Sequence, residues 1–211
     1  KLELYKTKTG DYYLPKYAAK AHNVLTVSNF TKSDIITRYG LESSEVSVVY
    51  NAADIKFQPL ALDLQDGIRR NYTEGVSFFL YVGALHPRKN IERLLLAFDQ
   101  FKNQSKSETK LLLVGRKAWG NEGMKKVYNS MSNKKDVVFT GRVSDEVLPN
   151  LYSSAKALIY VPYFEGFGMP IVEAQASGVP VITSNKSSMP EVLGDAGILV
   201  DPFSVDSIAT V

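Results

Sequence analysis

The sequence predicts an α/β fold with a doubly wound parallel sheet, on two observations. Six apolar runs recur along the chain, and each is nearly continuous rather than alternating with polar residues, which is typical of parallel strands buried on both faces. Stretches with apolar residues at helical spacing lie between several runs, and strands that alternate with helices indicate a doubly wound sheet. The runs cover residues 76–83, 110–115, 137–141, 157–161, 179–183 and 197–200.

Three stretches between these runs have the apolar spacing of amphipathic helices. The first spans residues 90–98, and we expect the Asn90 side chain to cap its N-terminus. The second spans residues 145–155, and the third spans residues 170–177 with a proline in its first turn. Residues 63–75 are mainly polar, and we expect a mobile surface segment there.

The N-terminal quarter of the chain follows a different pattern. Strand-like runs at residues 23–28 and 45–50 enclose a helix-like stretch at residues 32–39. This single β-α-β unit is too small to bury a core of its own. We therefore expect the remnant of a preceding domain and a linker in residues 1–55, and the main domain in residues 56–211.

Composition and charge narrow the classes of function. The chain has 25 Lys and Arg against 22 Asp and Glu, and its net charge of +3 is too small to indicate a nucleic-acid-binding face. Cysteine is absent and only two histidines are present, which leaves little for a metal cluster and fits a reducing compartment. No apolar run has the length of a membrane span, and no signal peptide opens the chain. The chain begins at Lys1 rather than Met, so we expect a further N-terminal portion.

Two neighbouring cations follow the first strand of the predicted sheet. Ligands of open parallel sheets bind beyond the carboxyl ends of the strands, and residues 83–90 lie there. Arg88 and Lys89 come just before a predicted helix start, where free N–H groups and the helix dipole favour anions. The pair therefore indicates a diphosphate site, although a solvated basic loop would have the same sequence.

The most informative stretch, residues 165–173, follows the fourth strand of the sheet. Gly166 and Gly168 allow the backbone to approach a ligand closely, and the helix start after them offers N–H donors to phosphate oxygens. Glu165 precedes this turn, and Glu173 is expected in the first helical turn. Ionised carboxylates only accept hydrogen bonds, so sugar hydroxyls are natural partners. Taken singly, Glu173 is also explained as an acid that complements the helix dipole, and the glycines as an ordinary turn; the combination favours a sugar–nucleotide site.

Weaker candidates follow two other strands. Arg142 comes after the third strand and has the chemistry to stack on or bond to a nucleobase, and Trp119 has the size to wall a base pocket. A surface arginine and a packed tryptophan explain these two residues equally well. His86 lies close to Arg88, but we expect no catalytic role for it because no orienting carboxylate lies nearby in sequence.

These motifs resemble those of the retaining glycosyltransferases of family 4, often called group 1, which have a GT-B fold of two Rossmann-like domains. Glu165 and Glu173 match the Glu-x7-Glu signature of that family, within residues 163–182. Residues 81–90 are similar to its donor-phosphate loop. Further matches lie at residues 27–32, 49–54, 188–197 and 200–202, and the resemblance covers roughly residues 17–208.

The resemblance implies a role for each matching residue. Lys89 would neutralise the donor diphosphate, and Arg88 would assist in place of the arginine that many members carry where Ala84 stands. Glu173 would bind the ribose. Glu165 would contact the transferred sugar and stabilise charge at its anomeric centre, so Glu165 and Lys89 are the implied catalytic residues. The implied donor-binding set is Gly83, Arg88, Lys89, Arg142, Glu165, Gly166, Phe167, Gly168, Met169, Pro170, Ile171 and Glu173.

The resemblance also implies the reaction. A hexose would pass from a nucleoside-diphosphate sugar to a glycan or lipid-linked acceptor with retention, in polysaccharide or lipopolysaccharide biosynthesis. GDP-mannose is the first expected donor and a UDP-sugar the next, and no cofactor or metal is expected. The family binds its acceptor mainly through the N-terminal domain. We therefore expect residues 56–211 to be a donor domain without its final helix, inactive alone, from a cytoplasmic protein peripheral at the inner face of the membrane.

Two other interpretations remain open at the level of sequence. The chain could be a non-catalytic nucleotide-sugar-binding module, although intact Lys89, Glu165 and Glu173 argue against decay. An NAD-binding Rossmann-like protein is disfavoured, because the turn after the first strand lacks the Gly-x-Gly-x-x-Gly pattern.

Overall fold

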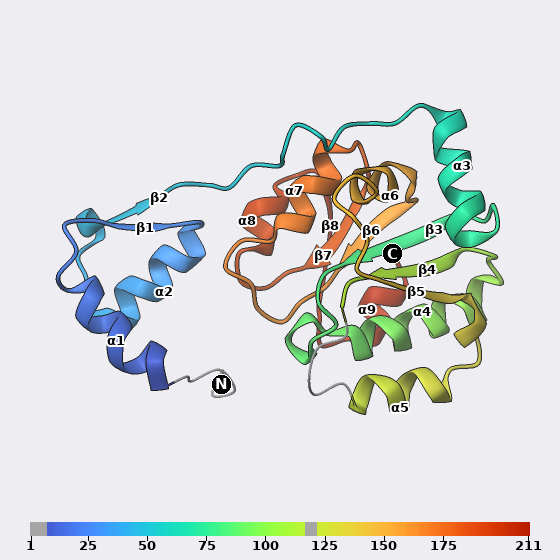
Figure 1. Ribbon diagram of the computed structural model, residues 1–211. Helices are drawn as coiled ribbons and strands as arrows, with labels where there is room; N and C mark the ends of the chain where they lie inside the picture. The colour runs from blue at the N-terminus through green and yellow to red at the C-terminus, as the bar shows by residue number, and fades with distance from the viewer. Residues whose placement is uncertain (1–7, 117–121) are drawn as a thin grey trace. The chain divides into compact units, whose positions relative to one another are not determined.

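The structure, a computed structural model, describes residues 8–116 and 122–211. The chain forms two compact units, Lys1–Asn51 and Ala52–Val211, and each is described by itself (Figure 1). The larger unit contains the sheet and every candidate site residue.

The sheet of the larger unit has six strands in the order β5-β4-β3-β6-β7-β8. Every neighbouring pair is parallel, so the predicted doubly wound, Rossmann-like α/β sheet is confirmed. The order reverses between β3 and β6, and the helices that follow these two strands pack on opposite faces of the sheet. The strands are β3 (Phe78–Val82), β4 (Lys110–Val114), β5 (Val137–Gly141), β6 (Ala157–Tyr160), β7 (Val181–Ser184) and β8 (Gly197–Val200).

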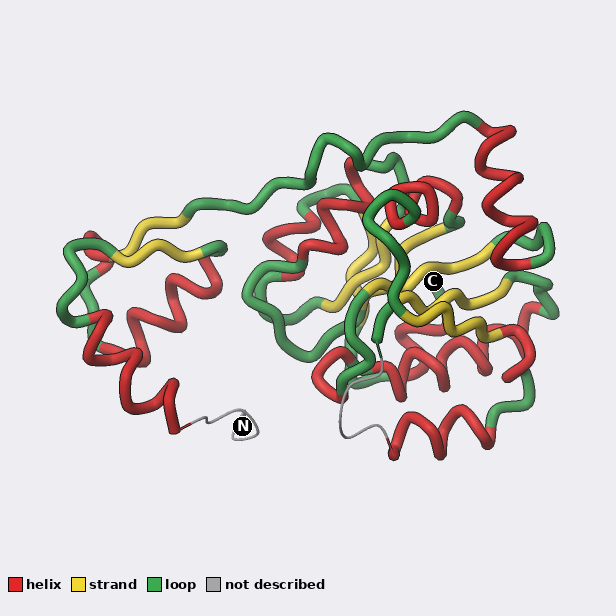
Figure 2. The backbone as a smooth tube through the Cα atoms, in the orientation of Figure 1, coloured by secondary structure: helices red, strands yellow, loops and turns green. Residues whose placement is uncertain are grey.

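Helices cover both faces of this sheet, as Figures 1 and 2 show. On one face α4 packs against α5 and α9, and on the other α6 packs against α3 and α7, with α8 beside α7. The two helical layers explain why the strands are apolar throughout: Leu80 in β3 and Leu112 in β4 have no exposed surface. The helices are α3 (Leu62–Thr73), α4 (Ile91–Ser105), α5 (Glu122–Ser130), α6 (Leu148–Ser154), α7 (Met169–Ala176), α8 (Met189–Leu193) and α9 (Val205–Ala209).

Residues 63–75, where we expected a mobile surface segment, instead form most of helix α3, which packs on the core. Ile68 and Tyr72, four positions apart, pack against the core from an otherwise polar helix. The Arg69 side chain donates a hydrogen bond to the Ser154 carbonyl at 3.2 Å, which ties α3 to the end of α6. Two apolar residues on one face and one long-range hydrogen bond are enough to hold this helix on the core. Its mainly polar composition, taken alone, predicts a segment exposed to solvent.

The smaller unit contains the predicted β-α-β arrangement and one further helix. Its two strands are parallel, and the Ser28 hydroxyl accepts a hydrogen bond from the Thr31 N–H at 3.1 Å to cap the helix between them. Among the described residues of this unit, Val46 alone is a buried hydrophobic side chain, in line with the expectation that the unit has no core of its own. The elements are α1 (Lys8–Ala18), β1 (Val24–Thr26), α2 (Asn29–Tyr39) and β2 (Val46–Val48).

Within residues 8–116 and 122–211, no helix combines the length and apolarity needed to cross a bilayer.

Candidate functional site

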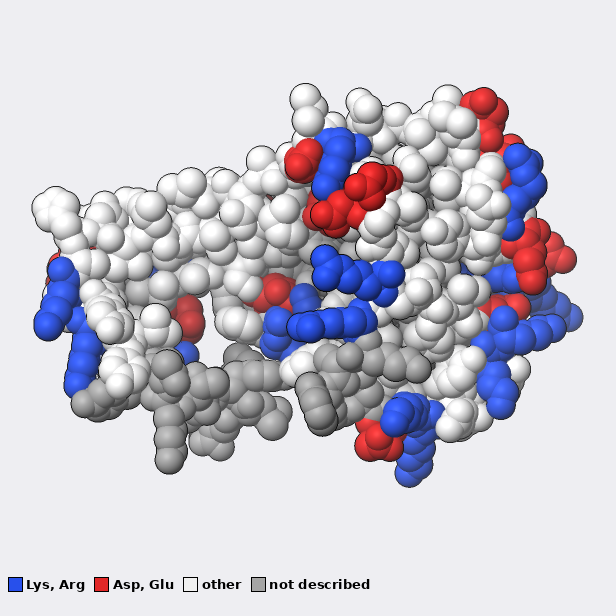
Figure 3. Space-filling view, in the orientation of Figure 1, with Lys and Arg blue, Asp and Glu red and all other residues white. Residues whose placement is uncertain are grey.

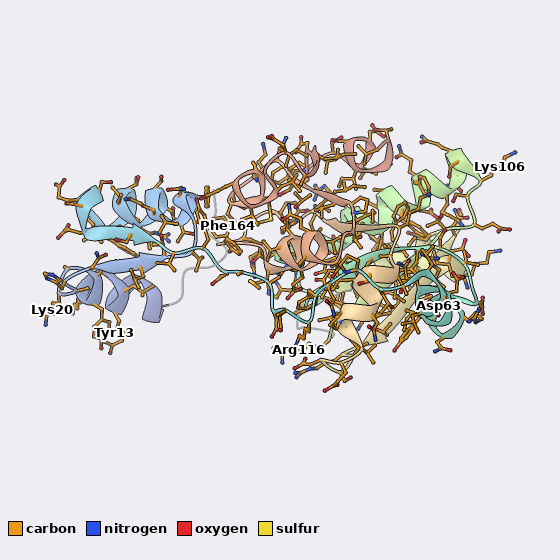
Figure 4. All side chains as sticks on the ribbon, turned by 90° about the horizontal axis from the view of Figure 1, so that it is seen from above. Tyr13, Lys20, Asp63, Lys106, Arg116 and Phe164 are labelled. Carbon is orange, nitrogen blue, oxygen red and sulfur yellow. The ribbon has the colours of Figure 1, made fainter. Side chains whose placement is uncertain are left out.

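The candidate site lies at the carboxyl edge of the sheet, where the loops after β3, β4 and β6 meet. The Tyr163 N–H donates to the Arg88 carbonyl at 3.2 Å, which joins the β3 and β6 loops. The β3 and β4 loops touch at Gly83 and Gly115, where a Cβ on Gly115 would lie 1.9 Å from the Gly83 carbonyl oxygen. In Figure 4, Phe164 of the β6 loop and Arg116 of the β4 loop lie at the opposite edge of the sheet from Lys106. The site therefore occupies the point at which the strand order reverses, where doubly wound sheets bind ligands.

A short 3-10 turn presents the two cations of the β3 loop. Pro87–Lys89 form this turn, which begins where the His86 ring nitrogen accepts a hydrogen bond from the Arg88 N–H at 3.2 Å. Asn90 ends the turn in a left-handed conformation with φ of 63°, so it does not cap α4 through its side chain as predicted. Its amide instead donates to the carbonyls of Val161 at 2.9 Å and Pro202 at 2.8 Å, and the residue is 1% exposed. Asn90 thereby fixes the β3 loop against the ends of β6 and β8.

Arg88, Lys89 and Glu165 form one ion cluster. Lys89 Nζ lies 2.5 Å from Glu165 Oε1, and Arg88 Nη1 pairs with the same oxygen. Arg88 Nη1 also donates to the Phe164 carbonyl at 2.6 Å. The predicted cations from the β3 loop and the predicted acid from the β6 loop are thus brought together, across the point where the strand order reverses.

Buried tyrosines form the floor beneath this ion cluster. Lys89 Nζ lies 5.0 Å from the centre of the Tyr160 ring and donates to its hydroxyl, and the Tyr160 ring stacks on Tyr81 at 6.1 Å. Burial lowers the pKa of Lys89, and the Glu165 carboxylate opposes that shift. Burial, followed by the charge of Glu165, raises the pKa of Tyr81 and Tyr160, so both hydroxyls stay neutral. Lys89 is therefore a partly desolvated cation that depends on an anion for compensation.

The turn after β7, which contains Ser187 and Ser188, makes hydrogen bonds to the loop that carries Glu165. The Ser187 hydroxyl accepts from the Glu165 N–H at 3.2 Å. The buried Ser188 hydroxyl lies 3.0 Å from the Glu165 carbonyl and 2.8 Å from the Phe167 carbonyl. Gly168 has φ of 114°, a conformation that L side chains rarely adopt, so a substitution there would be strained. This support fixes the backbone on both sides of Gly166.

Helix α7 begins at Met169, one residue after this loop. Pro170 occupies its first turn, as predicted. The Ile171 N–H donates to the Gly168 carbonyl at 2.9 Å and the Ile171 side chain is fully buried, so Ile171 does not offer an N–H group to a ligand as expected. The N–H groups of Gly168 and Met169 remain as candidate phosphate donors.

Glu173 has a different partner from Glu165. The Tyr152 hydroxyl donates to Glu173 Oε2 at 2.6 Å. Glu173 is the fifth residue of α7, and the first turn of α7 contains no acid, so the expected first-turn position is wrong. An explanation by the helix dipole, which acts within the first turn, is correspondingly weakened. Burial raises the pKa of Glu173, while the hydrogen bond from Tyr152 and the charge of Lys56 oppose that shift.

The structure does not bring every predicted residue to this point. Arg142 is exposed and follows β5, an edge strand that β4 separates from β3. Trp119 lies outside the described residues. The visible face in Figure 3 carries basic and acidic side chains in small separate groups. Among the described residues, no three His, Cys, Asp or Glu side chains group as ligands for a metal ion.

Four supporting residues were not anticipated from the sequence: Tyr152, Tyr160, Ser188 and, in its observed role, Asn90. Tyr160 ends an apolar strand and Tyr152 lies on an apolar helix face, and neither position differs in sequence from an ordinary core position. Only Asn90 offered a signal in the sequence. Asparagine adopts the left-handed conformation more readily than most residues, and it is also a favoured N-cap, so both roles fitted this position.

A family model described as glycosyl transferases group 1 matches residues 68–211. The chain is 33% identical over 187 residues to O-antigen chain mannosyltransferase B of Escherichia coli, covering 88% of this chain and 49% of that protein. It is 32% identical over 191 residues to O-antigen chain mannosyltransferase RfbU of Salmonella typhimurium, covering 90% and 50%. The chain thus spans about half the length of the curated relatives it matches.

The fold is similar to that of Anabaena Alr3699/HepE, solved in complex with UDP and glucose. The TM-score is 0.84 at 22% sequence identity, and the match covers 97% of this chain and 56% of that one. At this identity the likeness concerns the fold.

Proposed function

Because the chain belongs to the group 1 glycosyl transferases, we propose that it forms the donor-binding part of a retaining hexosyltransferase that uses a nucleoside-diphosphate sugar. One observation carries the proposal: Arg88 and Lys89 converge with Glu165 where the strand order reverses. Two cations, one of them partly desolvated, suit a diphosphate. The adjacent carboxylate suits the hydroxyls and the developing positive charge of the sugar.

The proposed roles follow from the position of each group. Lys89 and Arg88 bind the diphosphate and stabilise the charge that grows on it as the glycosidic bond breaks. The N–H groups at the start of α7 add further donors to the phosphate oxygens. Glu165, freed from part of its ion cluster by the phosphates, faces the anomeric centre and stabilises an oxocarbenium-like state. Glu173 accepts hydrogen bonds from the ribose.

GDP-mannose is our first choice of donor and a UDP-sugar the second. Both curated relatives quoted above are named mannosyltransferases of O-antigen chains, which supports mannose and a glycan or lipid-linked acceptor in polysaccharide synthesis. The structural neighbour was solved with UDP, which keeps the second choice open.

A thermal-shift panel with GDP, UDP and NAD tests the donor site. A ligand that binds only the native state stabilises it by about 2.7 kcal/mol at a hundred times its Kd, so binding raises the melting temperature. We expect GDP to give the largest shift and NAD none. A shift with NAD alone would overturn the proposal.

Transfer separates an enzyme from a non-catalytic binding module. We expect the 211-residue chain to bind nucleotide without turnover, because it spans about half the length of its relatives. The full-length protein should transfer mannose from GDP-mannose with retention and in the presence of EDTA, since Arg88 and Lys89 supply the positive charge. Absence of transfer by the full-length protein with any nucleotide sugar would favour the binding module.

A further inference from the structure

Tyr152 holds Glu173 from the neighbouring helix, α6. It lies on α6, has no exposed surface, and donates its hydroxyl to Glu173 Oε2 at 2.6 Å. The Tyr152 ring packs edge-on against the buried Phe57 ring at 5.5 Å and 84°. Because the core fixes the ring, the hydroxyl is a rigid donor, unlike a flexible side chain on the surface.

The hydrogen bond leaves a defined part of the carboxylate available. A carboxylate has two oxygens with about four acceptor positions, and Tyr152 occupies one position on Oε2. Glu173 itself is only partly buried, so Oε1 and the second acceptor position of Oε2 remain for a ligand. Within the part of the chain that the structure describes, the titratable groups that act on this carboxylate are Tyr152 from α6 and Lys56 from the segment before α3.

We propose that Tyr152 is a positioning residue: its hydroxyl fixes the orientation of the Glu173 carboxylate so that the two oxygens accept hydrogen bonds from the two hydroxyls of a ribose. This inference rests on the proposed function, since it deepens the role of Glu173 in binding the nucleoside. It adds a residue of the core to the site, on a helix that carries none of the predicted site residues.

The electrostatic surroundings agree with this role. Burial raises the pKa of Glu173 and so opposes its ionised form, whereas the hydrogen bond from Tyr152 favours that form. Burial also raises the pKa of Tyr152 well above its ordinary value, so the hydroxyl keeps its proton and remains a donor. Loss of the hydroxyl would therefore free the carboxylate to rotate and would raise the pKa of Glu173 further.

A binding cycle with two nucleotides tests the inference. Calorimetry would measure GDP and 2′,3′-dideoxy-GDP against the wild-type chain, Tyr152→Phe, Glu173→Gln and a control, Tyr128→Phe, which removes a hydroxyl from a ring that packs on Phe139 away from Glu173. We expect the wild type to prefer GDP by about 10- to 100-fold, the scale of hydrogen bonds to a charged group. The preference should fall to about threefold in Tyr152→Phe, fall at least as far in Glu173→Gln, whose neutral amide keeps one acceptor oxygen, and stay unchanged in the control.

The pH dependence of ribose-dependent binding distinguishes a positioning role of Tyr152 from a purely structural one, because loss of a purely structural residue would leave the midpoint of that dependence unchanged. Ribose-dependent binding should weaken as the pH falls through the pKa of Glu173, and the midpoint should lie at higher pH in Tyr152→Phe than in the wild type. If Tyr152→Phe does not fold, 3-fluorotyrosine at position 152 replaces it. This nearly isosteric residue is a stronger donor, so it should increase the preference for GDP and lower the midpoint.

The outcomes distinguish the inference from the function on which it rests. If Glu173→Gln lowers the preference while Tyr152→Phe retains it in full with an unchanged midpoint, the positioning role is wrong and the donor site stands. If GDP does not bind, the proposed donor site is wrong. If Glu173→Gln keeps the full preference for GDP, the proposed role of Glu173 in binding the ribose is wrong, and the role of Tyr152 is wrong with it.

Discussion

Replacement of Lys89 by Met separates the function of the ion cluster from its contribution to stability. Lys89 is 15% exposed in its side chain, and burial disfavours its charged form. Met has a similar volume and no charge, and Glu165 keeps Arg88 as its counter-ion in the variant. We therefore expect Lys89→Met to change the free energy of unfolding by less than about 1.5 kcal/mol, as volume-conserving replacements do.

The effect of Lys89→Met on nucleotide binding should be much larger. A hydrogen bond to a charged group contributes about 1.5–3 kcal/mol, which corresponds to a loss of about 10- to 150-fold in GDP affinity. Calorimetry at fixed ionic strength measures this loss, and urea unfolding measures the stability.

A matched control for this variant is Lys135→Met. Lys135 is exposed and lies just before β5, at the opposite edge of the sheet, so this variant loses the same charge without touching the ion cluster. An equal loss of GDP affinity in the two variants would refute the argument, because binding would then follow net charge alone. A Lys89→Met chain that binds GDP as the wild type does would refute it as well.

Three further predictions concern the groups around the cluster. Glu165→Gln should bind GDP about tenfold more tightly, because a carboxylate no longer competes for Arg88 and Lys89; weaker binding in calorimetry would contradict this. Glu173→Gln should gain stability over the wild type as the pH rises above about 4.3, since the raised pKa of Glu173 makes its ionisation unfavourable in the folded state. Urea unfolding between pH 4 and 7 measures how the difference in free energy of unfolding between Glu173→Gln and the wild type changes with pH. A difference that stays constant would contradict this explanation. Ser188→Ala should cost about 1–3 kcal/mol in urea unfolding, because it removes the buried hydroxyl that donates to the backbone carbonyls of this loop; an unchanged midpoint would show that water replaces it.

The sheet could be predicted from sequence because its strands are buried on both faces. Positions such as Leu80 and Leu112 are fully buried, and a strand buried on both faces is apolar along its whole length. Each strand can therefore be predicted from its own residues, without knowledge of its neighbours. Helix α3 escaped prediction because Ile68 and Tyr72 are its only apolar side chains that pack against the core, and the hydrogen bond that ties it to α6 joins Arg69 to the distant Ser154.

The site was predictable where its position follows from strand order. Lys89 and Glu165 each follow a strand, and parallel strands bring their carboxyl ends to one edge, so both residues were expected at that edge. Their direct contact depends on β3 and β6 being neighbours, which the sequence pattern did not predict. Their supports were not predictable, because the Tyr152 hydroxyl and the Asn90 amide act on partners 21 and at least 71 positions away. The place of Glu173 beyond the first turn depends on α7 starting at Met169, a boundary that the pattern does not fix.

The central claim is that a nucleoside diphosphate binds where the β3 and β6 loops meet. The most direct measurement is a titration of the ¹⁵N-labelled chain with GDP, followed by amide chemical shifts. We predict that the shifted amides cluster in residues 83–90 and 165–173, with little change at the opposite edge around Lys106 and Lys135. Saturable shifts confined to other parts of the chain, or no saturable shifts with either GDP or UDP, would contradict the claim.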